Sequence, residues 1–466
     1  MTTKDDVSRH STRNKCWIVI RGVAYDVTDF LNQHPGGSSV ILGQAGDDAT
    51  EAFEAVHSAD LLANHQGPIR KVGPVLDAKP ATQEVIKVDK SDAAGKAARR
   101  RLVKVINIAD FEAAAAEVLQ PKYFAFFKAG ADSEVAARWN QRSWDAIRLR
   151  PRILVPARPV DMSTTILGTS FSAPFFIAPA GGGKFAHSQG EVLWTRAAAK
   201  HGILQWVCNN AGCTQKEMAD ARSPGQSLYW QIYAMKDLEA TKREVERAVA
   251  SGYKGFALTV DAIQVGKRER DMRLNIEEND PDPDEDESTL ANSISATRPA
   301  CYDQFDFTSA IKWLRSMTDL PIAIKGVQSW EDAALCMHHH VHPWLSNHGG
   351  RQLDGAPSAA ETLLEIRQHC PEVLERCDVI VDGGITRGSD IVKALALGAK
   401  GVAIGRGFLF ALTFGEPGVE KAIRILKHEV ETTMGLLGVA SIKEISFSHV
   451  DASGLAYAGA VIRAHL

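Results

Sequence analysis

Eight short apolar runs, separated by amphipathic stretches, occupy the chain from Pro174 onward. The runs cover residues 174–180, 204–209, 228–233, 255–261, 321–327, 344–350, 378–384 and 401–407. The stretches between them, such as residues 237–252, place apolar residues at helical spacing and end near a glycine. Strands that are apolar throughout are buried on both faces, as in a parallel sheet covered by helices. The alternation therefore predicts an α/β fold whose main unit is a (β/α)8 TIM barrel.

The chain is also long enough to hold a second unit. Its 466 residues exceed one ordinary core, and a hydrophobic content of 45% suffices for packed interiors. Residues 76–105, "LDAKPATQEVIKVDKSDAAGKAARRRLVKV", contain few bulky side chains, which is typical of a linker. We therefore expect a small domain over residues 1–77, a linker over residues 78–105 and the barrel domain over residues 106–466.

Charge and cysteine usage restrict the class of partner. A formal net charge of -4 provides no global basic field, so neither nucleic acid nor an anionic membrane is an expected partner. The seven cysteines form no C-x-x-C pair, and we expect a reducing compartment.

The first residues show no apolar signal region, so we expect a cytoplasmic protein. The C-terminal "AHL" is a degenerate match to a peroxisomal signal, which leaves the peroxisome as an alternative.

Two local segments have alternative interpretations. The acidic segment 277–287, "EENDPDPDEDE", predicts a mobile, solvated loop between the fourth and fifth strands, with a docking surface for a basic partner as the alternative. The segment "MHHHVHP" is expected to finish a helix and enter the sixth strand, although Pro343 removes a hydrogen bond from a central strand. A metal site at His340 and His342 is the alternative there.

The ends of the predicted strands are unusually polar. They are Gln231 and Tyr233 (third strand), Thr259 and Asp261 (fourth), Lys325 (fifth), His348 (sixth), Asp382, Gly383 and Gly384 (seventh), and Gly405 and Arg406 (eighth). Reactive groups of TIM barrels lie at these C-terminal strand ends, and the loops after the seventh and eighth strands commonly bind phosphate. No G-x-G-x-x-G follows a first strand, so the pattern favours a mononucleotide over NAD.

The N-terminal region carries strand patterning to Val27 and then two short helical patterns, with His34 and His57 at their edges. Either histidine alone would be interpreted as a surface or turn residue. The segments "YDVTDFL", "HPGG", "AGDDATEAF" and "HS" together resemble the cytochrome b5 domain, a small α+β domain. The resemblance implies that His34 and His57 are the axial ligands of haem b. Such a haem has no open iron position and transfers single electrons.

Residues 106–466 resemble the FMN-dependent α-hydroxy-acid dehydrogenase family through "LTVDA", "IKGV", "SNHGGRQLD", "DGGITRGSD" and "AIGRG". Preceded by a haem domain, the arrangement resembles the flavocytochrome b2 family of cytochrome-linked L-lactate dehydrogenases. This implies oxidation of an L-2-hydroxy acid to a 2-oxo acid, with electrons passing from FMN through haem to a cytochrome c-like acceptor. It also implies a homo-oligomer, a tetramer, and offers the mitochondrial intermembrane space as a further location. An oxidase that uses oxygen and a non-catalytic flavohaem protein are the alternatives.

The same resemblance implies roles for individual residues. His348 is the base that takes the hydroxyl proton, and Asp261 stabilises the resulting imidazolium. Arg351 and Arg268 bind the substrate carboxylate, and Tyr233 bonds to the substrate oxygen. The residues implied to hold FMN are Pro179, Ala180, Gly181, Cys208, Gln231, Thr259, Lys325, Asp382, Gly383, Gly384, Ile385, Thr386, Arg387, Gly405 and Arg406.

Several positions depart from the family pattern. Phe126 replaces a tyrosine that meets the substrate carboxylate, and Cys208 replaces a small hydroxyl residue near the flavin. Thr386 replaces an arginine, which leaves the phosphate to Arg406 and Arg387. Gly181 and Asn210 stand where relatives carry larger or more apolar side chains. We therefore expect a wide pocket that prefers longer or aromatic hydroxy acids to L-lactate, and that Gly181→Leu would restore a preference for small acids.

Overall fold

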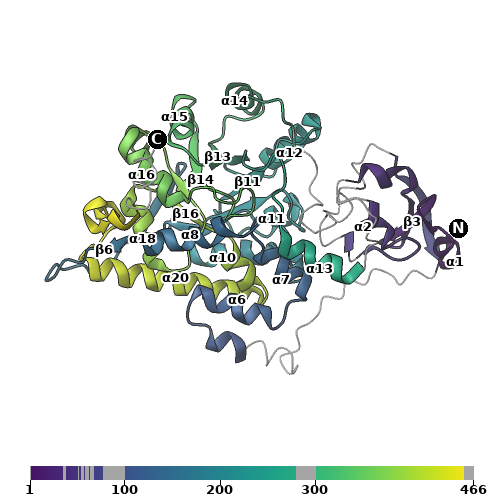
Figure 1. Cartoon of the computed structure of the whole chain (residues 1–466), viewed down its shortest axis with the longest axis horizontal. Helices are drawn as coiled ribbons and strands as arrows, with labels where there is room; N and C mark the ends of the chain where they lie inside the picture. The colour runs from purple at the N-terminus through teal and green to yellow at the C-terminus, as the bar shows by residue number, and fades with distance from the viewer. Residues whose placement is uncertain are drawn as a thin grey trace.

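A computed structural model describes residues 2–34, 38–50, 52–53, 57, 62, 68–76, 100–279 and 301–455. The barrel forms the larger part of the molecule, and the N-terminal segment forms a separate small unit to one side of it (Figure 1). Within the described ranges, no helix combines the length and the apolar character needed to cross a membrane.

The larger unit is a closed barrel of eight parallel strands, as the alternating pattern predicts. The strands are β9 (Phe175–Ile177), β10 (Gln205–Cys208), β11 (Leu228–Ile232), β12 (Phe256–Thr259), β13 (Ile322–Val327), β14 (His342–Leu345), β15 (Ile380–Val381) and β16 (Gly401–Ile404). They pair in chain order, and β16 returns to β9. Each strand lies within or overlaps one of the eight predicted runs. The predicted fold class is therefore confirmed.

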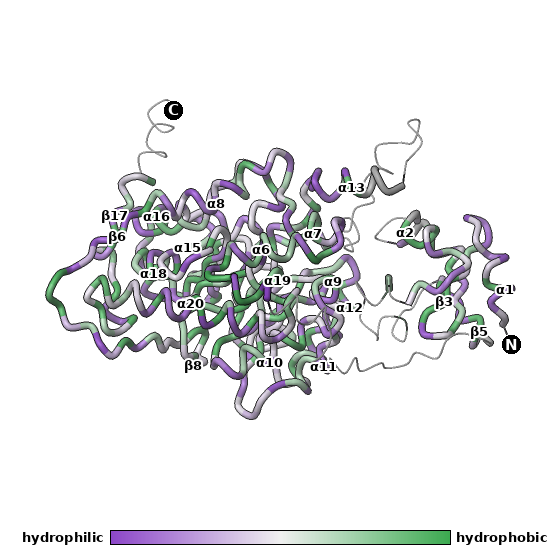
Figure 2. The backbone as a smooth tube through the Cα atoms, turned by 90° about the horizontal axis from the view of Figure 1, so that it is seen from below, coloured by the Kyte–Doolittle hydropathy of each residue, from purple (hydrophilic) through white to green (hydrophobic). Residues whose placement is uncertain are grey.

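The barrel interior is filled by large side chains facing small ones. Phe176, Trp206, Tyr229 and Trp344 form the aromatic part, and the rings of Trp206 and Trp344 have centroids 4.8 Å apart. Alanines on β12, β13 and β16 complete the layer, so bulky and small residues interdigitate. The hairpin of β7 (Thr164–Ile166) and β8 (Thr169–Phe171) caps the N-terminal end, where the Tyr229 hydroxyl donates to Thr169 Oγ1 at 2.8 Å. Figure 2 shows the hydrophobic residues concentrated in the barrel.

Helices surround the barrel and bury the outer faces of its strands. They are α9 (Gly183–Ala186), α10 (Val192–His201), α11 (Gln215–Asp220), α12 (Leu238–Ala250), α13 (Glu269–Asn279), α14 (Phe307–Arg315), α15 (Trp330–His338), α16 (Ala359–His369), α17 (Glu372–Arg376), α18 (Gly388–Leu397), α19 (Arg406–Leu412) and α20 (Gly415–Leu437). The short elements at the C-terminal end are η3 (Ile442–Glu444), η4 (Phe447–His449) and β17 (Val450–Asp451), which pairs with β6 (Arg148–Leu149).

Three helices that precede the barrel reach its C-terminal mouth. They are α6 (Ile108–Ala116), α7 (Pro121–Lys128) and α8 (Val135–Asp145). From α8, Asn140 exchanges two amide hydrogen bonds, of 2.7 and 2.8 Å, with Asn347 in the loop after β14. Trp144 of the same helix donates to the carbonyl of Gly383, in the loop after β15, at 2.9 Å. Helix α8 therefore ties the ends of two adjacent strands together.

The N-terminal unit contains a five-stranded sheet in the order β1-β5-β4-β3-β2. Its elements are β1 (Thr2–Thr3), α1 (Lys4–Ser8), β2 (Ser11–Thr12), β3 (Lys15–Ile20), β4 (Val23–Asp26), η1 (Thr28–Gln33), α2 (Ser38–Leu42) and β5 (Arg70–Leu76). The strand pattern predicted up to Val27 is confirmed by β3 and β4, and the first short helical pattern corresponds to η1, which ends beside His34.

Three local expectations have different outcomes. The segment "MHHHVHP" does end helix α15 and enter β14, and Pro343 is accommodated inside that strand next to an irregularity in its pairing with β13 between Lys325 and Val327. The acidic segment 277–287 is helical in its first three residues, because α13 ends at Asn279, and the rest lies outside the described residues. Of the predicted linker, residues 78–99 also lie outside them, and residues 100–104 are helical.

Candidate active site

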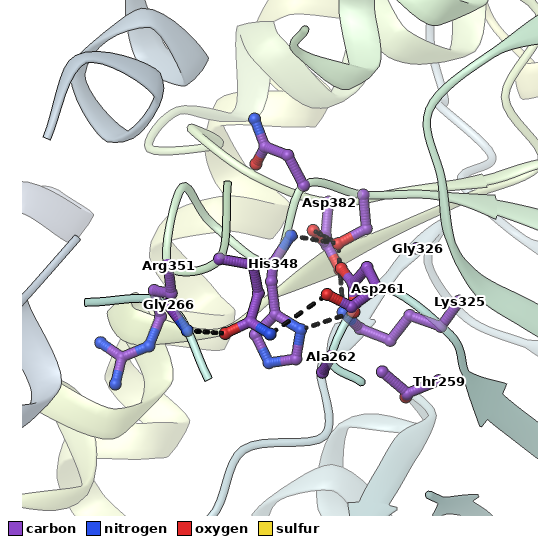
Figure 3. A network of polar contacts seen from close by, with 12 residues as sticks. Thr259, Asp261, Ala262, Gly266, Lys325, Gly326, His348, Arg351 and Asp382 are labelled. Carbon is purple, nitrogen blue, oxygen red and sulfur yellow. Dashed lines mark hydrogen bonds and ion pairs between the residues drawn. The ribbon is translucent and has the colours of Figure 1, made fainter. Parts of the chain in front are cut away.

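His348 and Asp261 form the centre of the barrel mouth. The loop after β14 carries His348 in a left-handed conformation, with φ of 58°, and the next two glycines continue in that region. Gly350 allows the loop to approach α8, because a Cβ there would stand 2.3 Å from the Ala137 nitrogen. The loop thereby turns the His348 ring toward β12, where Nδ1 lies 2.9 Å from Asp261 Oδ1 (Figure 3).

The electrostatics of this pair favour a neutral imidazole held by an ionised carboxylate. Burial lowers the pKa of His348, Asp261 raises it, and nearby Lys325 and Arg268 lower it, with a net fall below the ordinary value. Burial opposes ionisation of Asp261, but the interactions with His348 and Lys325 together outweigh burial and bring the pKa of Asp261 below its usual range. A neutral imidazole can accept a proton through Nε2 while Nδ1–H donates to Asp261. The pair therefore has the arrangement of a general base with an orienting carboxylate.

Gly326 makes room for Asp261. It has φ of +111°, and a Cβ at this position would stand 2.6 Å from Asp261 Cβ and 2.7 Å from its Cγ. Such contacts are too short for any side chain. The glycine on β13 is therefore what allows the carboxylate to lie across the neighbouring strand, as Figure 3 shows.

A second buried group lies behind the pair. Lys325 Nζ is 3.1 Å from Ser346 Oγ and 3.4 Å from Asp382 Oδ2. Burial works against the charge of this lysine, but Asp382 and Asp261 outweigh burial and raise the pKa of Lys325. Ser346 donates to Asp382 Oδ1 at 2.6 Å and accepts the backbone N–H of His348 at 3.0 Å. Lys325 is thus a fixed positive charge at the floor of the mouth.

Three arginines converge on the same cavity: Arg268, Arg351 and Arg406. Arg351 donates to the backbone carbonyls of Phe126 and Ala129, at 2.9 and 2.7 Å, and its guanidinium lies over the Phe126 ring. Burial, together with the charges of Arg268 and Arg406, lowers the pKa of Arg351 well below its ordinary value. Clustered cations in a buried cavity are relieved by bound anions, so the arrangement suits a carboxylate and a phosphate.

The loops after β15 and β16 form the other side of the cavity. Gly383, Gly384, Ile385 and Thr386 line it from the first loop, and Gly405 and Arg406 from the second. Arg406 also donates to the carbonyl of Gly349 at 2.6 Å, which joins this side to the His348 loop. Arg387 points elsewhere: its guanidinium pairs with Glu429 on α20 at 3.2 Å. The structure therefore gives no support to Arg387 as a phosphate ligand.

The remaining sequence-predicted residues also lie around the mouth. Pro179, Ala180, Gly181, Cys208 and Tyr233 line the cavity. Gln231 and Thr259 are buried beneath it, where Gln231 Nε2 donates to Thr259 Oγ1 at 2.9 Å. The Gln231 Oε1 atom is buried without a hydrogen-bond partner among the described residues.

Gly181 differs from our expectation in one respect. A Cβ at Gly181 would stand 2.8 Å from the Asn210 carbonyl oxygen, so it would meet backbone and not open cavity. A leucine at this position would displace the end of β10 instead of filling the pocket. Gly181→Leu is therefore not expected to restore a preference for small acids.

The N-terminal unit contributes the far end of the cavity, which has a total volume of about 1000 Å³. Apolar residues, among them Ile18, Phe30 and Leu62, surround His34 and His57 there. Burial, with a smaller effect from His34, lowers the pKa of His57 to about 4, which keeps its imidazole neutral. The two rings have centroids 6.1 Å apart. With metal–imidazole bonds of about 2 Å on each side, the centroids of two axial rings lie roughly 6 Å apart, so one iron fits between them.

The structure does not support the alternative prediction of a metal site at His340 and His342. His340 lies in the turn after α15 with φ of 54°, and His342 Nδ1 accepts the backbone N–H of Asp378 at 2.9 Å. Among the described residues, no group of three or more His, Cys, Asp or Glu side chains is arranged to hold a metal ion.

Comparison with known proteins agrees with this geometry. Residues 115–452 match the family model of the FMN-dependent dehydrogenases. The chain belongs to the FMN-dependent dehydrogenase family. Residues 3–101 match the model of the cytochrome b5-like heme/steroid binding domain. FMN and haem are therefore the cofactors of this FMN-dependent dehydrogenase.

Several relatives match along most of their length. The L-lactate dehydrogenase (cytochrome) of Wickerhamomyces anomalus is 37% identical over 450 residues, which are 95% of this chain and 78% of that protein. The peroxisomal (S)-2-hydroxyacid oxidase GLO3 of Arabidopsis thaliana is 37% identical over 74% of this chain and 96% of its own. A solved flavocytochrome b2 with pyruvate bound has a TM-score of 0.70 at 34% identity, covering 78% of this chain and 92% of that one.

Two residues at the site were not predicted from the sequence. Ser346 joins Lys325, Asp382 and the backbone of His348 through its hydroxyl. Gln352 donates to the carbonyls of Asp261 and Gln264 and accepts from Arg268 at 3.1 Å. Ser346 could have been found as the first polar residue after the sixth strand. Gln352 gave no such signal, because it lies four residues beyond His348 on a loop.

Proposed function

We propose that this dehydrogenase oxidises an L-2-hydroxy acid to the 2-oxo acid and passes the electrons singly through haem to a cytochrome c-like protein. The observation that carries the proposal is the His348–Asp261 pair, which faces the same cavity as Arg351, Arg268 and Tyr233. A base, two anion-binding groups and a phenol around one space match the hydroxyl, carboxylate and carbonyl oxygen of such a reaction. Relatives with the names L-lactate dehydrogenase (cytochrome) support lactate as one substrate.

In this proposal, His348 removes the proton from the substrate hydroxyl. Its neutral form is favoured by burial before reaction, and Asp261 stabilises the imidazolium that forms when the proton arrives. The hydrogen bond between Nδ1 and Asp261 also fixes the tautomer, so that Nε2 is the accepting nitrogen.

Arg351 and Arg268 hold the substrate carboxylate, and Tyr233 bonds to its reacting oxygen. Phe126 provides no hydroxyl and instead supports the Arg351 guanidinium from below, with the ring centroid 5.4 Å from Cζ. Arg351 donates to backbone carbonyls through Nη1, and within the described residues its other N–H groups make no hydrogen bond, so they can bind a carboxylate.

FMN, when bound, accepts two electrons from the substrate carbon and returns them one at a time. We propose that Arg406 and the backbone of residues 382–386 and 405 hold its phosphate, and that Gln231, Thr259 and Cys208 lie along the ring system. Lys325 would supply a positive charge that stabilises the flavin in its reduced, anionic form. The Gln231 Oε1 atom, which has no partner in the part of the chain that the structure describes, would accept a hydrogen bond from a ring N–H.

Electron transfer from the barrel to haem is supported by the shared cavity. Its lining includes residues of the barrel mouth at one end and His34 and His57 at the other. His34 and His57 would hold the haem iron, which would supply single-electron transfer. An oxidase is the second candidate, because hydroxyacid oxidases match the barrel alone at similar identity. Rapid peroxide formation in place of cytochrome c reduction would favour it.

The test is anaerobic mixing of the holoenzyme with L-lactate while the flavin and haem absorption bands are followed. The proposal expects flavin bleaching before haem reduction, and a loss of bleaching of roughly 10²–10⁴-fold in His348→Ala, as for a lost general base. Unchanged bleaching in His348→Ala would contradict the role of His348. An absence of bleaching by any L-2-hydroxy acid in the parent enzyme would contradict the reaction itself.

Three further expectations remain proposals. The boundaries at residues 77 and 105 would be tested by limited proteolysis. A homotetramer would be tested by light scattering of the holoenzyme. A cytoplasmic location, with the peroxisome and mitochondrial intermembrane space as alternatives, would be tested by fluorescence imaging of the tagged chain.

A further inference from the structure

The cavity extends beyond Tyr233, between the ends of β10 and β11 and the first half of α12. This extension is lined by Asn209, Asn210, Met235, Lys236, Asp237, Ala240 and Glu244. It adjoins the mouth where Gly181 lies directly against Asn210, and both residues line the same cavity. The extension therefore begins where the carbon chain of a 2-hydroxy acid would leave the reacting centre.

Glu244 lies at the inner end of this extension. It stands on α12 beside Val245, which packs into the barrel's helix layer. Its Oε1 atom accepts the indole N–H of Trp230 at 2.7 Å. Burial raises the pKa of Glu244 to about 7, and the hydrogen bonds from Trp230 and Asn209 and the charge of Arg247 only partly oppose this. A carboxyl group in a cavity wall whose pKa stays raised despite these contacts can accept a further hydrogen bond from a ligand.

Asn209, which bonds to Glu244, adds an unsatisfied acceptor to the same wall. Its Oδ1 atom is buried and has no hydrogen-bond partner among the described residues. Lys236 and Asp237 carry opposite charges at the exposed rim, so they add no net charge to the extension. The inner wall is thus dominated by oxygen acceptors, on Glu244 and Asn209, that face a space adjoining the substrate. A ligand group that donates hydrogen bonds would pair with Asn209 Oδ1 and give the Glu244 carboxylate a further donor.

We infer that this extension binds the substrate's side chain and that Glu244 and Asn209 select L-2-hydroxy acids whose chain ends in a hydrogen-bond donor. An ammonium or hydroxyl group at the end of a chain of three or more carbons pairs with Asn209 Oδ1 and with the Glu244 carboxylate, whereas a terminal methyl leaves Asn209 Oδ1 unpaired and adds no donor to Glu244. Discrimination against a group that cannot pair with buried polar atoms is stronger than discrimination by size alone. The inference rests on the proposed function, because it names the substrate class of that site.

The test compares two acids of the same length with the holoenzyme. L-2-Hydroxy-5-aminopentanoate and L-2-hydroxyhexanoate differ only in the terminal group, and L-lactate reports the basic reaction. The expected ratio of kcat/KM, amino over methyl, is about tenfold or more in the parent enzyme, because a hydrogen bond to a charged group contributes about 1.5–3 kcal/mol. In Glu244→Leu the ratio should fall below one. Glu244→Gln should give an intermediate ratio.

The matched control is Glu246→Leu, on the exposed side of the same helix, which should leave the ratio unchanged. If Glu244→Leu fails to fold, Ala240→Leu fills the extension and should reduce kcat/KM for both long acids relative to L-lactate. A parent ratio near or below one, or an unchanged ratio in Glu244→Leu, would overturn the inference, as would an unchanged preference in Ala240→Leu. If no acid, L-lactate included, reduces the flavin, the proposed function fails; if L-lactate reduces it and the ratio fails, only the inference fails.

Discussion

Replacing Asp261 by asparagine isolates the charge of this residue from its hydrogen bond. Asn Oδ1 can still accept from His348 Nδ1–H, which now lies 2.9 Å from Asp261 Oδ1. The imidazolium and carboxylate charge centres would be about 4 Å apart, and at an effective dielectric constant near 20 their attraction is about 4 kcal/mol. Lys325 already offsets part of the Asp261 charge, so the imidazolium–carboxylate attraction is an upper bound on the effect of removing that charge. At about 1.4 kcal/mol per tenfold in rate, we expect flavin reduction to slow by roughly 10²–10³-fold.

The same substitution should move the pH profile in a defined direction. His348 must be neutral in the free enzyme, so kcat/KM rises with pH through the pKa of His348. Asp261 raises that pKa, in opposition to burial and Lys325. Removing the carboxylate therefore lowers the pKa of His348 further, and the acid limb of the profile shifts to lower pH while its plateau falls.

The assay is anaerobic stopped-flow reduction of the flavin by L-lactate over a range of pH. Absorption spectra of the variant should first show that flavin and haem are both bound, so that a slower reaction reflects chemistry. A variant that reacts at the parent rate, or whose acid limb moves to higher pH, would refute the assignment of Asp261 as the stabilising charge.

Two further predictions concern the haem ligands and the glycine beside Asp261. His34→Ala or His57→Ala should remove the haem absorption band and abolish cytochrome c reduction while L-lactate still bleaches the flavin; a haem spectrum that is unchanged in both variants would exclude the axial pair. Gly326→Ala should lower the free energy of unfolding by about 1–3 kcal/mol and slow flavin reduction, because its Cβ would stand 2.7 Å from Asp261 Cγ. Gly355→Ala, which has φ of +79° but open space around its Cβ, is the matched control in thermal unfolding and flavin reduction; equal effects in the two variants would show that backbone strain alone is responsible.

The sequence by itself indicated the architecture and the strand-end residues of the site. Apolar runs such as residues 401–407 suit strands buried on both faces, and eight of them separated by helices indicate a parallel barrel covered by helices. Because all eight strands of such a barrel end at one mouth, the polar residues that follow them converge there, among them Lys325 and His348. Local pattern was sufficient for the fold and for these strand-end residues, whereas Arg268 and Arg351 came from the family resemblance and Ser346 and Gln352 were not predicted.

The tertiary structure alone decided which of those residues face one another. Arg387 lies one residue from Thr386, yet its guanidinium pairs with Glu429 of α20, more than forty residues later, while Thr386 lines the cavity. Glu244 looked like one of several carboxylates on an amphipathic helix, and only the packing of α12 beside β10 and β11 buries it next to Asn209. Side-chain direction at a helix start, and the space left between packed elements, depend on contacts between residues distant in sequence. No local periodicity encodes those contacts.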